Sequence, residues 1–151
     1  MGSTLIDLSA AMLEALAAKF PDKEITLVQD SYFDAELGTQ VYDAAVSVES
    51  LHHYPFEKKV ALYRKLHDAL RDGGRFVLTD YFAESVEQEK AYFDELARLK
   101  REQNITDDAL YHYDTPLTVE HEIEALRAAG FSAVHVLNRW ENTYTILAEK
   151  Q

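Results

Sequence analysis

The side chains best suited to chemistry gather in one short segment near the middle of the chain. It holds two serines, an acid and two adjacent histidines, namely Ser47, Glu49, Ser50, His52 and His53. A histidine in reach of a substrate can take or give a proton near neutral pH. The segment therefore predicts a binding site, with His52 and His53 as candidate catalytic residues.

A run of small apolar residues leads into this segment. Ala44, Ala45, Val46 and Val48 show no polar alternation, which is typical of a strand covered on both faces in a parallel sheet. Open α/β sheets bind ligands outside the carboxyl ends of their strands. The serines and histidines would therefore lie at the ligand-binding end of a central strand.

The adjacent histidines also raise the question of a metal. In an extended chain neighbouring side chains point to opposite sides, so His52 and His53 would make a poor pair of ligands. We expect no metal site. A lone histidine is more often a satisfied core or interface residue, and this reading stands beside the catalytic one.

The rest of the chain supplies the elements that must position these groups. Apolar patterns predict strands near 5–6, 25–28, 44–48, 76–78, 134–137 and 144–147, and helices near 10–20, 55–72, 86–103 and 119–129. The last two strands are joined by so short a turn that they must be antiparallel. This order predicts an α/β fold with a mostly parallel sheet, in a single domain over residues 4–151.

Several motifs resemble those of the class I S-adenosylmethionine-dependent methyltransferases. An acid, Asp43, opens a strand, and the sequence Ser-Leu-His-His follows it at 50–53. The pattern L-x-x-G-G-x-F at 70–76 leads into the next strand, and 129–131 resembles the family's Ala-Gly-Phe turn. The resemblance runs from Leu5 to Lys150. It implies a Rossmann-like sheet with the last strand inserted antiparallel, and S-adenosyl-L-methionine as cofactor.

The family's first strand and Gly-rich loop would precede Leu5, so we expect an N-terminally truncated form. Residues 1–3 read as a cloning scar. The missing strand would lie between the strands that end at Asp7 and Ser47, and its loss would leave two edges with unpaired backbone groups. Three outcomes are open: the two strands pair with each other, a second copy supplies the pairing, or the chain is only marginally folded. We favour a homodimer, in one version strand-swapped.

The resemblance implies a cofactor site at three strand ends. Asp7 matches the acid that accepts the two ribose hydroxyls, and Asp30 matches the acid near the adenine amino group. The other implied contacts are Leu8 and Met12 at the adenine, Ser31 and Tyr32 beside Asp30, and Ser47, Val48 and Ser50 along the methionine part. Helix-terminal acids, an apolar helix face, and turn or cap residues explain the same positions without a ligand.

Aromatic residues predict a substrate pocket. Tyr81, Phe82 and Tyr92 could wall it, although core packing or burial in a dimer explains them as well. Residues 84–117 would form a lid or cap. By resemblance the histidine pair borders the substrate cavity, where either ring could orient the acceptor or act as base.

Composition limits the partners. With 27 acidic and 15 basic residues the net charge is −12, which disfavours a nucleic-acid partner. No apolar stretch is long enough to span a membrane, and the absence of cysteine suits the cytoplasm. The expected function is methyl transfer to a small-molecule acceptor. The alternative is a non-catalytic, dimeric interaction module that has lost cofactor binding.

Overall fold

The computed structural model describes residues 2–7, 10–105 and 114–151 of the chain. These form two compact units, residues 1–37 and 38–151, and each is described by itself. The prediction of a single domain over residues 4–151 stays a prediction.

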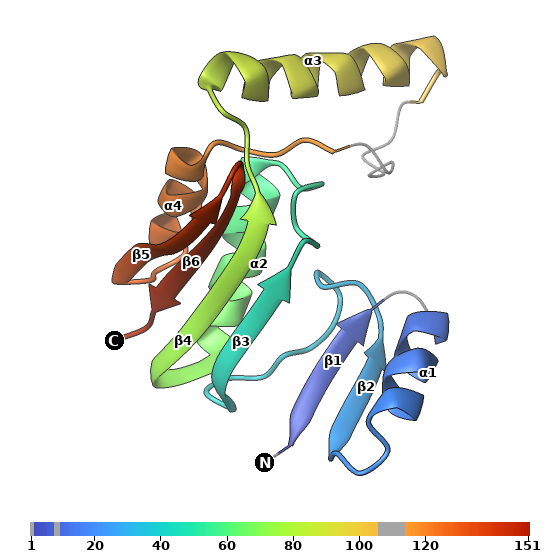
Figure 1. The fold of residues 1–151 in the computed structure, drawn as a ribbon, viewed down its shortest axis with the longest axis vertical. Helices are drawn as coiled ribbons and strands as arrows, with labels where there is room; N and C mark the ends of the chain where they lie inside the picture. Colours follow the sequence, from blue (N-terminus) through green and yellow to red (C-terminus); the bar gives the residue numbers. More distant parts are fainter. Residues whose placement is uncertain (1, 8–9, 106–113) are drawn as a thin grey trace. The chain divides into compact units, whose positions relative to one another are not determined.

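The N-terminal unit is a single β-α-β unit with two parallel strands (Figure 1). It consists of β1 (Ser3–Asp7), α1 (Ala10–Lys19) and β2 (Ile25–Gln29). β1 and β2 pair in parallel, with Asp7 opposite Gln29. Among the described residues of α1 only Leu13 is buried, whereas Met12 is exposed, so the apolar face predicted for this helix is only partly buried. β1 already includes Ser3, one of the residues read as a cloning scar.

The C-terminal unit is built on a four-stranded mixed sheet (Figure 1). Its strands are β3 (Tyr42–Val48), β4 (Leu70–Tyr81), β5 (Ala133–Trp140) and β6 (Thr143–Glu149), in the order β3-β4-β6-β5. β3 is parallel to β4, and β6 is antiparallel to both of its neighbours. The predicted α/β class and the antiparallel insertion of the last strand are confirmed.

Two helices, α2 (Phe56–Ala69) and α4 (Val119–Ala128), lie side by side behind this sheet (Figure 1). Alternate residues of β4 are buried, as a strand with one covered face requires. The core between the two helices and the sheet includes the side chains of Leu62, Tyr63, Phe76, Leu78, Leu126 and Ile146, together with Phe131 from the turn between α4 and β5. Each such large apolar side chain contributes roughly 1.5–3 kcal/mol of burial free energy.

The expectation that β3 is a central strand covered on both faces is wrong within its unit. β3 stands at the end of the sheet and pairs with β4 alone among the described strands. Its side chains Val46 and Val48 are 69% and 60% exposed. The unit's two sheet-packing helices lie behind the sheet, so the apolar run of β3 keeps an uncovered face.

The helix before Gly73 ends earlier than predicted, at Ala69 instead of at the glycine pair. β4 starts at once with Leu70, and the pairing jumps from Tyr42–Leu70 to Ala44–Arg75, so that residues 71–74 bulge from the ladder. Gly73 has a φ of +82°, and a Cβ on Gly74 would lie 2.7 Å from the carbonyl oxygen of Arg71. The glycines serve this bulge, because neither position accepts a side chain without strain.

The helix α3 (Val86–Glu102) matches its predicted range and has no buried residue. It is linked to the start of α4 through Glu89, which accepts a hydrogen bond from the Thr118 backbone nitrogen at 2.8 Å and also bonds His121 Nδ1. Thr118 caps α4 as predicted. The lid role of residues 84–117 stays a prediction. In the described ranges no helix is long and apolar enough to cross a membrane.

Candidate functional site

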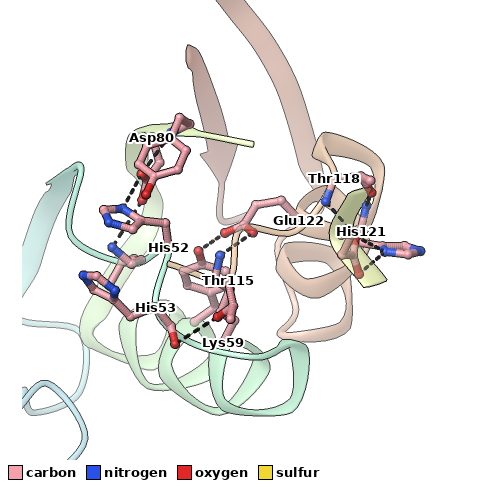
Figure 2. Close-up of polar contacts among 12 residues, drawn as sticks. His52, His53, Lys59, Asp80, Thr115, Thr118, His121 and Glu122 are labelled. Atoms are coloured by element: carbon pink, nitrogen blue, oxygen red, sulfur yellow. Dashed lines mark hydrogen bonds and ion pairs between the residues drawn. The ribbon is translucent and has the colours of Figure 1, made fainter. Parts of the chain in front are cut away.

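A histidine–aspartate pair lies at the carboxyl ends of β3 and β4. His52 follows β3 in a turn, and its Nδ1 is 2.9 Å from Oδ1 of Asp80, near the end of β4 (Figure 2). Asp80 is buried and is itself held by the backbone nitrogens of Leu51 and Tyr81. Since β3 and β4 are parallel neighbours, their ends bring the two residues together from distant parts of the sequence.

The charge of His52 is set by two opposing effects. Burial by itself lowers the pKa of this histidine. The hydrogen bond and negative charge of Asp80, with the charge of Asp114, more than offset burial, so the pKa of His52 is raised above its ordinary value. The site therefore favours positive charge at the ring.

A second acid reaches the same histidine from the chain that follows α3. Oδ1 of Asp114 lies 3.3 Å from His52 Nε2 and 3.2 Å from His53 Nδ1. The neighbouring Thr115 fixes this position, because its backbone nitrogen donates to the His52 carbonyl at 3.0 Å and its hydroxyl to the His53 carbonyl at 3.3 Å. Thr115 is fully buried.

The expectation that the two histidines point apart is wrong. Their ring centroids are 4.2 Å apart with an interplanar angle of 50°, and both rings approach Asp114. The reason is local, because the backbone at 52–53 forms a turn instead of an extended strand. The argument against a paired ligand site therefore does not hold.

Of the three predicted substrate residues, Tyr81 joins this cluster. Its ring lies 4.4 Å from that of His52. Burial, then a hydrogen bond to Asp114, raise the pKa of Tyr81 far above its ordinary value, so the hydroxyl stays protonated and donates to the acid. Charge at the half-buried Tyr92 of α3 contributes to the same shift.

Phe82 faces a different environment. It is buried and packs edge-on against Tyr144, with ring centroids 5.7 Å apart. It also lines an open, polar cavity of about 530 Å³ with Glu120, Arg139 and Asn142 among its other walls. A shared substrate pocket for Tyr81, Phe82 and Tyr92 remains a prediction.

The predicted serines lie close together at the end of β3. The hydroxyls of Ser47 and Ser50 are 2.9 Å apart, and Glu49 between them has a φ of +50°, which reverses the chain. Each serine thus satisfies the other, as the turn alternative requires. Val48 is exposed. Contact of these residues with a cofactor remains a prediction.

In the N-terminal unit, the two predicted acids follow neighbouring strands. Because Asp7 pairs with Gln29, Asp7 and Asp30 lie at the same edge of the β1–β2 pair. One oxygen of Asp30 accepts the Ser31 backbone nitrogen at 2.8 Å, and the Ser31 hydroxyl donates to Asp34 at 2.9 Å. Asp30 and Ser31 therefore already make hydrogen bonds that stabilise the turn after β2, and Tyr32 is the next residue in the chain. Leu8 lies outside the described residues.

The expected meeting of Asp7 with the cluster near His52 concerns the arrangement of the two units, and it stays a prediction. Sequence reasoning did not select Asp80 or Asp114. Asp80 could have been found, since it ends the strand after the one that leads to the histidines. Asp114 follows no strand or helix pattern, and only the fold brings it to the site.

Comparison with known proteins agrees with this architecture. The profile described as "Methyltransferase domain" matches residues 2–74. Carboxy-S-adenosyl-L-methionine synthase of Helicobacter hepaticus is 27% identical over 116 residues, which cover 72% of this chain and 48% of that protein. The protein of the same name from Nautilia profundicola is 25% identical, covering 96% of this chain and 65% of that one. The chain thus spans about half to two thirds of these relatives.

Among solved structures, an S-adenosylmethionine-dependent methyltransferase from Mesorhizobium loti superposes with a TM-score of 0.70 at 21% identity, covering 97% of this chain and 80% of that one. At this identity the likeness shows a shared fold. The sequence of residues 2–74 is thus similar to methyltransferase domains, and over nearly its whole length the chain shares the fold of this S-adenosylmethionine-dependent methyltransferase.

Proposed function

We propose that this chain is a S-adenosylmethionine-dependent methyltransferase, or the bulk of one, that acts on a small molecule. The observation that carries the proposal is the methyltransferase-domain match over residues 2–74. That range includes all the residues for which the resemblance implies cofactor contacts. The relatives' printed names, which refer to S-adenosylmethionine chemistry, support the same cofactor.

The residues of the N-terminal unit fit a nucleoside. Asp7 and Asp30 follow paired parallel strands at one edge, and the carboxylate is the side chain that best accepts hydroxyl and amino donors. Asp7 would hold the ribose hydroxyls. Asp30 uses one oxygen for its turn and would offer the other to the adenine amino group. The exposed Met12 would contact the adenine face.

In the C-terminal unit, Ser47, Val48 and Ser50 would line the methionine part. When bound, the cofactor supplies an activated methyl group, so the protein needs no nucleophile of its own. What the chain must do is align the acceptor with that methyl and exclude water. His52, fixed by Asp80, and the adjacent ring of Tyr81 would orient the acceptor.

A second candidate function follows from the relatives' names. Both curated relatives described above are called carboxy-S-adenosyl-L-methionine synthase, a name that makes a modified cofactor the product. An enzyme of this kind would bind the same cofactor and, instead of transferring its methyl group, add to it a carboxyl group that a second, carboxyl-donating substrate gives up. The two activities differ in product, so mass spectrometry separates them. Methyl transfer yields S-adenosylhomocysteine, and the synthase yields a heavier cofactor.

The decisive experiment is calorimetric titration of the whole chain with S-adenosylmethionine. We expect saturable binding that Asp7→Asn weakens by roughly 10- to 100-fold, the equivalent of a lost charge-assisted hydrogen bond. Asp22→Asn, an exposed acid in the α1–β2 turn, is the matched control and should leave binding unchanged. A folded protein that binds no cofactor at millimolar concentration would instead be the non-catalytic interaction module.

The proposal includes a cytoplasmic homodimer, in one version strand-swapped, without a nucleic-acid or membrane partner. The net charge of −12 supports the absence of a nucleic-acid partner, and the absence of cysteine supports the cytoplasmic location. The exposed Val46 and Val48 on β3 support self-association, because an apolar edge strand attracts a further strand.

A further inference from the structure

We infer that His52, His53 and Asp114 form a binding site for a divalent transition-metal ion of the zinc type. Each residue offers one ligand atom, and these atoms all lie within 4.8 Å of one another. The site shares His52 with the proposed acceptor-orienting group, but ion binding is measured without S-adenosylmethionine and so is tested separately.

The distances suit ligands that share an ion. Oδ1 of Asp114 is 3.3 Å from Nε2 of His52 and 3.2 Å from Nδ1 of His53. Around a tetrahedral zinc ion, bonds of about 2.1 Å keep neighbouring ligand atoms about 3.4 Å apart. Two of the three atom pairs already have this spacing, so an ion needs only a modest closing of the third.

The state of His53 is the second observation. Its Nδ1 is inaccessible to solvent, yet within the described part of the chain it has no hydrogen bond, despite the nearby Asp114 oxygen. The contact therefore has the distance but not the direction of a hydrogen bond. A ligand nitrogen points its lone pair at the ion and not at the neighbouring ligand atom. A shared ion would explain a buried polar atom that otherwise carries a desolvation cost.

Asp80 supports the proposed ligand His52 through the ring nitrogen that would not bind the ion. It bonds Nδ1 of His52 at 2.9 Å, so that nitrogen keeps its proton, and Nε2, which faces Asp114, is the atom that gives up its proton when an ion binds. Metal-binding histidines commonly donate their other ring nitrogen to a carboxylate in this way. The backbone bonds from Leu51 and Tyr81 hold Asp80 in turn, so the first ligand is oriented before any ion arrives.

The other ligands are held as well. Thr115 is hydrogen-bonded to the carbonyls of both histidines (Figure 2). Because Asp114 precedes Thr115 in the chain, these bonds also hold the acid beside the two rings. Two imidazoles and one carboxylate suit zinc, cobalt or nickel better than magnesium or calcium, which prefer oxygen. Three protein ligands also leave a fourth tetrahedral position, open to water or to a substrate oxygen.

The test is a calorimetric titration of the chelator-treated, whole chain with zinc alone, without S-adenosylmethionine. We expect one ion per chain. His53→Gln and Asp114→Asn should each weaken binding more than tenfold, and Asp80→Asn by about 10- to 100-fold, as for other groups behind a metal ligand. Cobalt should give the visible absorption of a tetrahedral site in the unaltered chain and lose it in these variants. Magnesium should not compete.

The control is His135→Gln, which removes an exposed histidine of β5 and should leave the zinc affinity unchanged. Circular dichroism confirms that each variant is folded, and His53 and Asp114 are the safer changes because both are partly exposed. Absence of zinc binding in the folded chain would overturn the inference, as would binding that survives both of these changes. Cofactor binding in the separate titration is unaffected by either outcome.

Discussion

Lys59 of α2 and Glu122 of α4 form an ion pair inside the core of the C-terminal unit, with Nζ 2.7 Å from Oε2 and exposures of 1% and 0%. The second carboxylate oxygen accepts the hydrogen bond of the Tyr63 hydroxyl, and Tyr63 is also fully buried. A charge removed from water is tolerated only when every lone pair is used. The three residues therefore fix how α2 and α4 pack.

Lys59→Met should destabilise the C-terminal unit by about 3–5 kcal/mol, because it leaves the Glu122 charge buried without its partner. Urea unfolding followed by the fluorescence of Trp140, the single tryptophan, measures the change. Glu124→Gln, which changes an exposed acid on α4, the helix of Glu122, is the control and should change the free energy of unfolding by no more than about 0.5 kcal/mol. Replacing Lys59, Tyr63 and Glu122 together by Met, Phe and Leu should restore much of the loss. Equal effects of Lys59→Met and Glu124→Gln would contradict the pairing.

Tyr63 makes the stability of this unit sensitive to alkaline pH. Burial, followed by the charge of Glu122, raises the pKa of Tyr63 well above 10.0. Above about pH 10 the unfolded chain releases this proton while the folded chain keeps it, so stability falls as pH rises. Tyr63→Phe should make that decline shallower by about 1.4 kcal/mol per pH unit. Urea midpoints measured from about pH 9 to 11 test this, and an unchanged slope would rule it out.

Lys150 closes the carboxyl end of α2. Its ammonium donates to the carbonyls of His67 at 2.9 Å and Leu70 at 2.7 Å, which satisfies groups that a helix end leaves unpaired. Lys150→Met should cost roughly 1.5–3 kcal/mol, the value of hydrogen bonds to a charged group. Lys100→Met on α3 is the comparison, and it should have little effect. If the two variants unfold at the same urea concentration, the capping role is wrong.

The glycine bulge in β4 gives a backbone test. Gly74→Ala would place a Cβ 2.7 Å from the Arg71 carbonyl oxygen, and Gly73→Ala would hold alanine at a φ of +82°. We expect Gly73→Ala to cost about 1–2 kcal/mol from backbone strain, and Gly74→Ala to cost more because backbone must move. Thermal unfolding gives the order, and the reverse order would mean that the bulge adapts readily.

The proposed dimer can be tested at β3. If Val46 and Val48 form the contact, replacing either with lysine should convert a dimer into a monomer in size-exclusion chromatography with light scattering, because a charge on an edge strand opposes pairing. Val86→Lys, an equally exposed valine on α3, should leave the dimer intact. A monomeric unaltered chain would refute the proposal directly.

The periodic elements could be predicted from the sequence, because burial on one face leaves a regular pattern. The range of α3, the Thr118 cap and the antiparallel pairing of β5 with β6 were accessible from local sequence, whereas the insertion of β6 beside β4 was implied by the family resemblance. Within the site, the position of His52 at a strand end was predictable, since it depends on one strand and its neighbour.

The predictions that failed concerned residues whose positions depend on the local backbone conformation or on contacts between distant parts of the sequence. The direction of His53 was wrong because a turn replaced the extended backbone. Asp114 was missed because its contact with the histidines spans about sixty residues of sequence and depends on a hydrogen bond from Thr115. The glycine pair was assigned to a helix end because helix caps and strand bulges call for the same residue.

The residues on either side of the segment 84–117 are paired with each other. Ala83 pairs with Thr118 there, and its nitrogen donates to the Leu117 carbonyl at 2.8 Å. Because the two ends of this segment are hydrogen-bonded to each other, the segment could be replaced by another without disrupting the pairing of the sheet strands. Since Asp114 belongs to that segment, replacing the segment would add or remove the acid beside the histidines. One replacement would therefore change the ligands of the site and what it can bind.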